Sequence, residues 1–279
     1  MEHAQTLTNY RSDIDRGERF AFGENWRAFL QDLTDERIEA ACESLREFIG
    51  WRDLRNMRFL DIGSGSGLFS LAARRLGANV QSIDFDAECV ACAETLRDRY
   101  CSDDPGWTIA QGSALEASTL PAAESADIVY SWGVLHHTGR MWDAMDNAAR
   151  CVAPGGLLYV AIYNDQGWRS RAWLAVKRLY NALPRALRWT VLWPCAARLW
   201  APAVVRNAVI GRPASSTRVR GMNPWWDLVD WVGGLPFEVA KPEEVLDFLR
   251  PRGFTLMRLR TCGGGLGCNE FLLRREATR

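Results

Sequence analysis

The sequence lacks net charge, the pattern of a secretory signal in its first twenty residues and a long uninterrupted apolar run. Its 34 basic and 34 acidic residues cancel, so the overall balance gives no support to a nucleic-acid partner. The first twenty residues, MEHAQTLTNYRSDIDRGERF, show neither the basic start nor the apolar core of a secretory signal, and we expect a cytoplasmic protein. In the tryptophan-rich region 166–220, arginine and proline recur too often for the roughly twenty apolar residues of a transmembrane helix.

Cysteine pairs with the spacing of a metal site are also missing. Eight cysteines are scattered along the chain, and only Cys262 and Cys268 resemble a pair. The five residues GGGLG separate these two, instead of the two residues of a CxxC site. We therefore expect reduced thiols in and near the core and no metal, with ligand or redox chemistry at this pair as the alternative.

The 279 residues, 48% of them hydrophobic, suffice for one main domain with elaborations. The segment TDERIEAACESLREFIG has a cap at Thr34, apolar residues at helical spacing and a stop at Gly50. Short strands are predicted at residues 57–62, 79–84, 107–111, 126–132 and 155–163, with helices between them. Repeated strand-helix-strand units predict a parallel sheet with helices on both faces. The final strands, GFTLMRLRT and CNEFLLRR, predict an antiparallel hairpin at the sheet edge.

A glycine loop follows the first strand, in the stretch FLDIGSGSGLFSLAA. Its glycines are Gly63, Gly65 and Gly67. The motif of dinucleotide sites would need its third glycine at Leu68, and no Gly-Lys-Ser/Thr of a nucleotide phosphate loop follows. Asp61, at the end of the strand, would repel a pyrophosphate but attract an ammonium group. S-adenosylmethionine carries such an ammonium group and no phosphate.

The second strand ends in another acid. Asp84 can accept hydrogen bonds from both hydroxyls of a ribose, and Phe85 beside it can lie on an adenine. Each glycine alone could belong to an ordinary turn between a strand and a helix. The combination of Asp61, three spaced glycines and Asp84 on successive strand ends is much more specific.

These residues resemble the class I S-adenosylmethionine-dependent methyltransferases, over roughly residues 57–162 and the terminal hairpin. The resemblance implies an α/β, Rossmann-like, seven-stranded and mostly parallel sheet with its last strand antiparallel and helices on both faces. It implies S-adenosylmethionine as the cofactor and S-adenosylhomocysteine as its product. The segment APGGLLYVAI is similar to the family's proline-glycine-glycine turn into the fifth strand.

The resemblance also implies a set of cofactor contacts. The methionine end is held by Asp61, Gly63, Gly65 and Gly67, and the ribose by Asp84. The segment QGSAL places Gly112, Ser113 and Ala114 at the adenine, although the family often has Asp where Ser113 stands. The segment SWGVLHHTGRMWDAM lines the methyl-donor cleft, with Ser131, Trp132 and Gly133 near the sulfonium.

His136 and His137 are two of only three histidines, and both stand where the resemblance places the substrate side of that cleft. Methyl transfer needs the methyl acceptor in line with the methyl carbon, and it also needs a group that deals with the acceptor's proton. An imidazole can act as a base near neutral pH. We predict that at least one of the pair takes or positions this proton. The alternative is that either residue only caps the next helix or packs in the loop.

Residues 166–220 form a second informative region, between the fifth strand and the hairpin. They contain ten arginines, one lysine, five tryptophans and no acid, so the local charge is +11. Two apolar stripes at helical spacing are predicted. One contains Ala172, Val176, Leu179, Tyr180 and Leu183, and the other Trp189, Leu192, Trp193, Ala196 and Trp200. Such helices suit an anionic membrane surface or a lid over an apolar substrate, and an amphipathic cap with solvated arginines is the alternative. Quinone-pathway O-methyltransferases look similar in carrying an insertion after the same strand.

Flanking segments complete the predicted site. In similar methyltransferases an N-terminal segment covers the cofactor, which makes Phe20, Phe22 and Trp26 candidates here. Downstream, RGMNPWWDLVDWVGGLPFE places polar groups among aromatic ones, as in a small-molecule pocket or a surface hairpin. Candidate substrate residues are Trp26, Asn223, Trp226 and Asp230. We divide the chain into a cofactor-covering segment (1–56), a cofactor-binding core (57–163), a helical insertion (164–222) and a substrate-side segment with the hairpin (223–279).

The sequence therefore predicts a methyltransferase acting on a small, apolar or aromatic acceptor, with oxygen ahead of sulfur and nitrogen. Reversible contact with a membrane surface through 166–220 is expected, and no nucleic-acid partner. Two alternatives stay open. One is methylation of RNA or protein, which only the basic insertion favours, and the other is a non-catalytic cofactor-binding or membrane-associated module.

Overall fold

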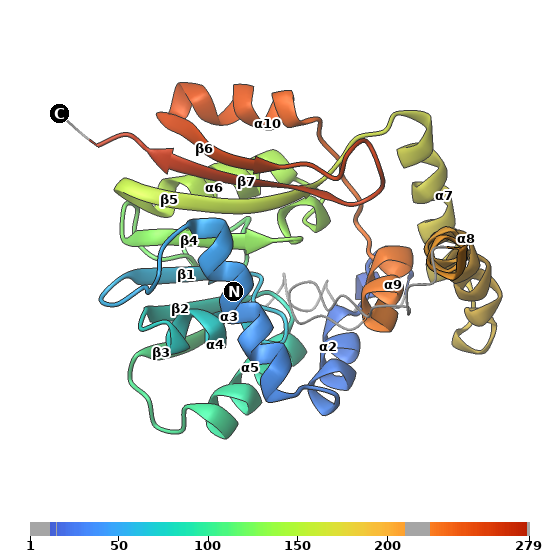
Figure 1. Cartoon of the computed structure of the whole chain (residues 1–279), viewed down its shortest axis with the longest axis horizontal. Coiled ribbons are helices and arrows are strands. Elements are labelled where there is room, and N and C mark those ends of the chain that lie inside the picture. Colours follow the sequence, from blue (N-terminus) through green and yellow to red (C-terminus); the bar gives the residue numbers. More distant parts are fainter. Residues whose placement is uncertain (1–11, 15, 210–223, 278–279) are drawn as a thin grey trace.

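The computed structural model of the protein describes residues 12–14, 16–209 and 224–277. A seven-stranded sheet runs through its centre (Figure 1), in the order β3-β2-β1-β4-β5-β7-β6. Strands β1 to β5 are parallel to one another, whereas β7 is antiparallel to both β5 and β6. This is the sheet that the sequence predicts. The strands are β1 Arg58–Ile62, β2 Asn79–Asp84, β3 Trp107–Gln111, β4 Ala126–Trp132, β5 Val152–Tyr163, β6 Phe254–Arg260 and β7 Cys268–Arg275.

Helix boundaries in the core follow local signals. Helix α3 has Thr34 as its N-cap residue and ends at Gly50, whose φ of 81° is the left-handed conformation that glycine adopts freely. The core helices are α3 Asp35–Ile49, α4 Leu68–Arg75, α5 Ala87–Tyr100, α6 Met141–Cys151 and α10 Pro242–Leu249. Short 3-10 helices cover η1 Leu135–His137, η2 Arg185–Leu187 and η4 Arg250–Arg252.

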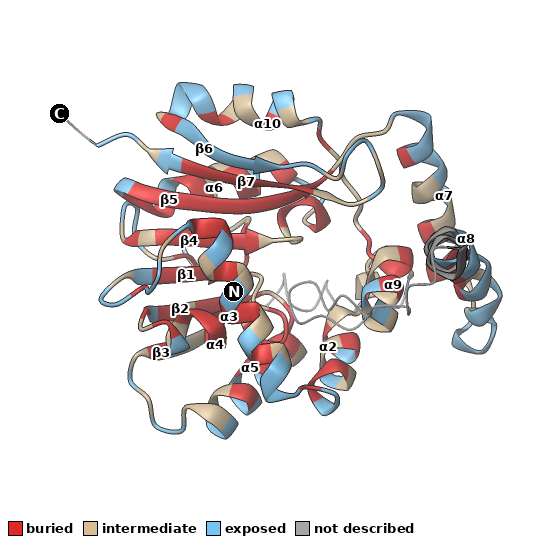
Figure 2. Ribbon diagram, viewed as in Figure 1, coloured by how far each residue is buried: buried red, intermediate tan, exposed pale blue. Residues whose placement is uncertain are grey.

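The two faces of the sheet are buried by different helices (Figures 1 and 2). Phe59 of β1 and Tyr159 of β5 belong to the cluster with α3, α4 and α5. The next residues along the strands, Leu60 and Val160, belong to the cluster with α6 and α10. Because side chains alternate along a strand, every central strand contributes to both clusters, and its carboxyl end is held in a fixed place.

The fifth strand begins earlier than predicted, at Val152 instead of Gly155. Its pairing with β4 shifts in register between Ala126 and Ile128, and Gly155 has a φ of 78° there. The glycine turn is therefore absorbed into an irregular start of the strand.

The insertion forms helices α7 Trp168–Ala182 and α8 Trp189–Val209, which lie outside the core beside α9 Pro224–Gly233 (Figure 1). The predicted stripes are partly wrong. On α7, Leu179 is 54% exposed while Lys177 is fully buried against α9. Helix α8 continues through Pro194, and Trp189 and Trp193 are exposed, whereas Leu192 and Ala196 of the same predicted stripe are buried. Each helix buries the face that contacts its packing partner. The local sequence pattern carries no information about that partner, so it cannot predict which face is buried.

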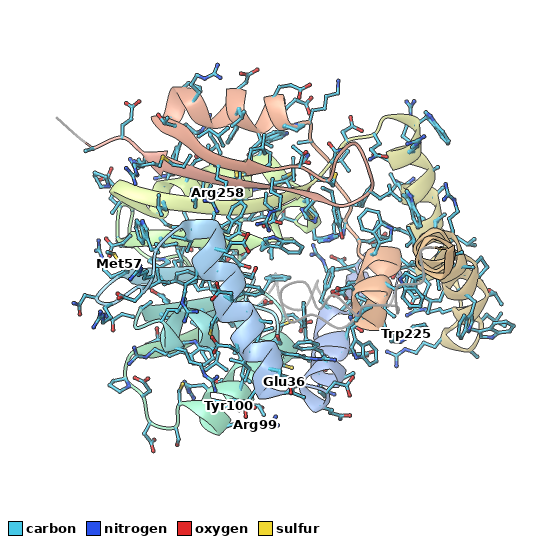
Figure 3. The ribbon with its side chains drawn as sticks, in the orientation of Figure 1. Glu36, Met57, Arg99, Tyr100, Trp225 and Arg258 are labelled. Carbon is cyan, nitrogen blue, oxygen red and sulfur yellow. The ribbon has the colours of Figure 1, made fainter. Side chains whose placement is uncertain are left out.

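Helix α9 and helix α2 Phe22–Gln31 close the open side of the sheet's carboxyl end. Residues 224–233 are helical, so the alternative of a surface hairpin there is wrong. Asn25 of α2 donates hydrogen bonds to the Trp226 carbonyl (3.1 Å) and to Oδ1 of Asp230 (2.7 Å). Trp225 lies between α9 and α8, with its ring 5.9 Å from that of Trp193 (Figure 3).

Candidate active site

A cavity of about 840 Å³ lies at the carboxyl ends of β1, β2, β3 and β4. The loops after these strands form one side, and residues of α2, α9, β5 and β7 form the other. This is the edge where parallel sheets bind ligands. The cavity therefore brings the two predicted strand-end acids together with the predicted substrate side.

The glycine loop approaches its neighbours too closely for larger residues. Gly63 has a φ of 78°, and a Cβ there would lie 2.3 Å from Val134. Gly65 has a φ of 54°, and a Cβ there would lie 2.9 Å from the indole of Trp26. Both glycines line the cavity. Gly67 does not line it; this glycine precedes α4 and packs against α5, so its role in the structure is to start the helix.

Asp61 lies at the floor of the cavity and is only 2% exposed. Its Oδ2 accepts a hydrogen bond of 2.5 Å from the Ser70 hydroxyl, which also bonds Ser82. Burial raises the pKa of Asp61 to about 7, and the nearby Asp84 carboxylate adds to the rise. A cation bound beside Asp61 would favour the ionised carboxylate and so lower this pKa again.

Backbone N–H groups of the neighbouring loops hold the Asp84 carboxylate in place. Its two oxygens accept backbone hydrogen bonds from Gly65 (2.8 Å) and Asp86 (2.9 Å). Burial raises the pKa of Asp84 to about 6, although these hydrogen bonds favour the charged form. Cys89 donates a third hydrogen bond to this carboxylate, and since each carboxylate oxygen has two lone pairs, at least one site is left for a ligand's hydrogen bond.

Most other predicted cofactor residues also line the cavity. These are Phe85, Gly112, Ser113, Ala114, Trp132 and Gly133. Ser131 does not; its hydroxyl donates to the Ile62 carbonyl at 2.9 Å inside the sheet, because side chains alternate along β4.

The two histidines are placed differently. His137 lines the cavity, whereas His136 is fully buried with its ring 3.9 Å from that of Tyr163. Nδ1 of His137 lies 2.6 Å from the Pro236 carbonyl oxygen, which can only accept a hydrogen bond. The proton of the neutral ring is therefore on Nδ1, and Nε2 keeps the lone pair that can accept a proton. Burial, Lys177 and Arg19 lower the pKa of His137 to about 3, so the ring is neutral around pH 7.

Of the four predicted substrate residues, two line the cavity and two do not or lie outside the described residues. Trp26 and Asp230 line the cavity. Trp226 does not, and its indole Nε1 lies 3.4 Å from Oδ2 of Asp32. Asn223 is outside the described residues.

Sequence reasoning missed several side chains on the substrate side. They are Phe22, named only as part of the cover, and Tyr163 and Cys268. Asp227 and Trp231 belong to the segment RGMNPWWDLVDWVGGLPFE, whose polar and aromatic residues predict a small-molecule pocket, and both line the cavity. Tyr163 ends the fifth strand, and the rule that ligands lie at strand ends could have found it. The Cys268 prediction considered only pairing with Cys262, yet Cys268 is a cavity residue.

Comparison with known proteins shows the family of the chain. A family profile described as "Methyltransferase domain" matches residues 34–200, more than half of the chain. The chain belongs to this methyltransferase family. The ubiquinone biosynthesis O-methyltransferase of Rhizobium leguminosarum bv. trifolii is 30% identical over 193 residues, or 64% of this chain and 72% of that protein. Its namesake from Rhizobium rhizogenes is 31% identical over 199 residues, or 68% of this chain and 75% of that protein.

A solved structure shows the shared fold. The magnesium protoporphyrin IX methyltransferase of Synechocystis PCC 6803, with bound S-adenosylhomocysteine (SAH), has a TM-score of 0.55 and 14% identity. The match covers 91% of this chain and 94% of that one. The protein described here is an S-adenosylmethionine-dependent methyltransferase.

The cavity of this methyltransferase fits its cofactor. Two buried carboxylates with raised pKa values, Asp61 and Asp84, face the cavity. An ammonium group beside Asp61 and hydroxyl groups beside Asp84 would complement them, whereas phosphates would be repelled. The loop glycines keep open the space that any Cβ would fill.

Proposed function

We propose that this methyltransferase transfers the methyl group to an oxygen atom of a small, apolar or aromatic acceptor. The observation that carries the proposal is the His137 ring, fixed in its Nδ1–H form in a wall that also contains Phe22, Tyr163 and Trp231. Aromatic side chains bind a flat apolar molecule, and Nε2 can accept the proton of a hydroxyl group. The Rhizobium relatives are named for O-methylation, which supports oxygen as the acceptor atom.

Each part of the chain has a proposed task. The bound cofactor supplies a methyl group on a sulfonium centre. Asp61 with Gly63 and Gly65 would hold the cofactor's amino-acid end, Asp84 its ribose, and Gly112 to Ala114 with Phe85 its adenine. Helix α2 would cover the cofactor, because Trp26 packs on Gly65 and the ring of Phe22 lies 5.0 Å from that of His137. In this arrangement His137 would take the proton of the acceptor's hydroxyl while that oxygen bonds the methyl carbon and the carbon–sulfur bond breaks, its electron pair leaving on the sulfur of SAH.

A radiolabelled-methyl screen tests the proposal. Purified protein is incubated with labelled S-adenosylmethionine and separate sets of phenols, thiols, quinol precursors, amines, RNA and protein, with and without lipid vesicles. We expect labelled ether products from phenols or quinol precursors. Transfer only to amines, RNA or protein would contradict an oxygen acceptor. Tight SAH binding without transfer to any set would favour the non-catalytic alternative.

The surface of the insertion supports a second proposal, reversible binding to an anionic membrane. Six of the ten large hydrophobic side chains that are exposed in the described residues lie on α7, η2 or α8. They are Trp168, Leu179, Leu187, Trp189, Trp193 and Trp200. Arginines alternate with them, and residues 166–220 contain no acid. Within the described ranges, no helix is both long and apolar enough to cross a bilayer. Contact with lipid would therefore be at the surface.

Vesicle co-sedimentation tests whether the exposed side chains of α7, η2 and α8 bind lipid. We expect binding to vesicles with anionic lipid, little binding to neutral vesicles, and about tenfold weaker binding for Trp189→Ala/Trp193→Ala, because two indoles lose their burial in the interface. The matched control is Leu256→Ala/Met257→Ala, which removes two exposed apolar side chains from β6, and it should bind as the wild type does. Equal sedimentation with anionic and neutral lipid would contradict the proposal.

A further inference from the structure

Glu270 of β7 places a buried acidic side chain on the wall of the cavity, and neither the cofactor contacts nor the proton transfer proposed above involve it. The residue lines the cavity and is only 7% exposed. Because β7 runs antiparallel to β5, the beginning of β7 lies at the edge of the sheet where the parallel strands have their carboxyl ends (Figure 1). Glu270 therefore lies at the same edge of the sheet as the strand-end acids Asp61 and Asp84, on a strand beyond β5.

The pairing register places Glu270 in one row with residues of two other strands. Trp132 of β4 pairs with Ala161 of β5, and Ala161 pairs with Glu270. Residues that are paired across neighbouring strands point to the same face of a sheet. Trp132 and Glu270 both line the cavity, and only the methyl group of Ala161 lies between them in this row. An apolar ring and a carboxylate thus lie side by side on one wall.

This row is remote from the place proposed for the amino-acid end of the cofactor. Asp61 is on β1, and the strand order places β4 and β5 between β1 and β7. Neighbouring strands are about 4.8 Å apart, so three strand spacings separate the backbones of Asp61 and Glu270 by about 14 Å. Tyr163 lies on the same side as Glu270, because it pairs with Cys268, and the ring of His137 is 5.3 Å from that of Tyr163. Glu270 therefore belongs to the acceptor side of the cavity.

Contacts on both oxygens hold the Glu270 side chain in place. Oε2 accepts a hydrogen bond of 2.5 Å from the Tyr159 hydroxyl, and Oε1 lies 3.6 Å from Nη1 of Arg260. Arg260 provides the positive charge that a buried carboxylate needs nearby. A carboxylate can accept about four hydrogen bonds, so these two contacts leave positions for a ligand.

The neighbours of Glu270 do not themselves require a carboxylate. A neutral amide oxygen would satisfy the Tyr159 hydroxyl, whose ring is already held by stacking on Phe48 at 4.4 Å. Arg260 has another partner, because its Nη2 lies 3.5 Å from Oε1 of Glu47. A buried carboxylate is costly compared with an amide. Its position on the cavity points to a ligand that the negative charge selects.

We propose that Glu270 is a specificity-determining residue, whose carboxylate accepts a hydrogen bond from a second polar group of the methyl acceptor. The inference rests on the proposed function, because it concerns the part of the cavity where that acceptor would bind. The acceptor then carries a hydroxyl or an ammonium group toward β7, besides the hydroxyl that meets His137. An alkyl group there would leave the buried carboxylate without a partner, and a carboxylate would be repelled.

Four phenols of similar length test this requirement. Tyramine, tyrosol, 4-propylphenol and 3-(4-hydroxyphenyl)propanoate share a hydroxyphenylethyl group, which ends in an ammonium, a hydroxyl, a methyl and a carboxylate group respectively. Calorimetry measures their binding to the SAH-loaded protein at pH 7, so no turnover is needed. We expect tyramine and tyrosol to bind about tenfold more tightly than 4-propylphenol, the contribution of one charge-assisted hydrogen bond, and the propanoate to bind most weakly.

Glu270→Gln tests whether this selectivity comes from the proposed residue. Glutamine keeps the shape of the side chain and an oxygen for the Tyr159 hydroxyl, but it removes the charge. The preference for tyramine over 4-propylphenol should fall below about threefold, and the propanoate should bind about tenfold more tightly than it does to the wild type. The matched control is Glu47→Gln, which removes the other carboxylate beside Arg260 and does not alter the cavity, and it should keep the wild-type order. Unchanged selectivity in Glu270→Gln would overturn the proposal.

Two further readouts separate this inference from misfolding and from the proposed function. SAH affinity should stay within about twofold in Glu270→Gln, and a loss of about tenfold in a variant that melts as the wild type does would place the carboxylate at the cofactor and overturn the proposal. If the phenols bind in the expected order but none is methylated, the proposed methyl transfer to a phenol is wrong and the role of Glu270 stands. If phenols are methylated but all four bind the wild type equally, or if none binds, the role of Glu270 is wrong.

Discussion

Replacing His137 with phenylalanine is expected to lower kcat by about 10²-fold, the lower end of the contribution of a positioned base, because a pKa of about 3 makes the ring a weak base. Phenylalanine keeps the ring that packs 5.0 Å from Phe22 but removes both nitrogens. The hydroxyl of the methyl acceptor then has no partner on η1 for its proton. Affinity for SAH should stay within about twofold, because the cofactor residues are unchanged. Single-turnover methyl transfer to a phenol from the screen measures the first effect, and calorimetry with SAH the second.

His136→Phe is the matched control. His136 is fully buried beside Tyr163 and does not line the cavity, so we expect kcat to remain within about threefold of the wild type. The reverse result, with a normal His137→Phe and an inactive His136→Phe, would assign the base to the buried residue. The wild-type pH profile adds a check. Because the pKa of His137 is lowered to about 3, kcat at saturating substrates should show no loss from this ring near pH 6.5.

Asp61→Asn is expected to weaken SAH binding by about 100-fold or more, because it leaves a buried ammonium group without its counter-charge. Asparagine has the same shape and can still accept the hydrogen bond from Ser70. Isothermal calorimetry at pH 8 measures the loss. An affinity within about threefold of the wild type would mean that the amino-acid end of the cofactor does not bind here.

The same variant should be more stable than the wild type when no cofactor is bound. Because the folded-state pKa of Asp61 is raised to about 7, its stabilising contribution is present below pH 4 and is lost as the pH rises through 7. At pH 8 the wild type carries the full cost of a buried carboxylate, whereas the variant has a neutral amide in its place. We therefore expect a higher melting temperature for Asp61→Asn at pH 8 and no difference at pH 4. A misfolded variant would instead melt lower at both.

Cofactor affinity should follow the same ionisations. SAH binding to the wild type is expected to weaken as the pH falls below 7 and Asp61 takes up a proton, and to weaken further below 6 as Asp84 does. The amino group of SAH stays protonated over this range. In Asp61→Asn, SAH affinity should fall only below pH 6, where Asp84 takes up a proton. A wild-type affinity that is flat from pH 8 to pH 5.5 would contradict both assignments.

The strands and the cofactor side can be predicted closely from the sequence. Strands β2, β3 and β4 have the predicted boundaries, because apolar runs and turn residues are local signals. Asp61 and Asp84 are predictable for the same reason: each lies at or near the end of a strand, and all parallel strands of one sheet present their carboxyl ends at one edge. The prediction for Ser131 did not apply strand alternation to the end of β4, and its hydroxyl lies on the other side of the strand.

The substrate side depends on contacts between distant segments. Which histidine reaches the cavity depends on the packing of η1 against Tyr163 and on the contact of His137 with Pro236, 99 residues further along the chain. In the sequence Lys177 is one more charge of a basic insertion, yet α7 turns it inward against α9. The sequence by itself determined the sheet, the glycine loop and its two acids, because these follow from period and spacing along the chain. Only the tertiary structure decided which histidine reaches the cavity, where α9 packs and that Lys177 is buried, because a helix buries the face that finds a partner and the partner is far away in sequence.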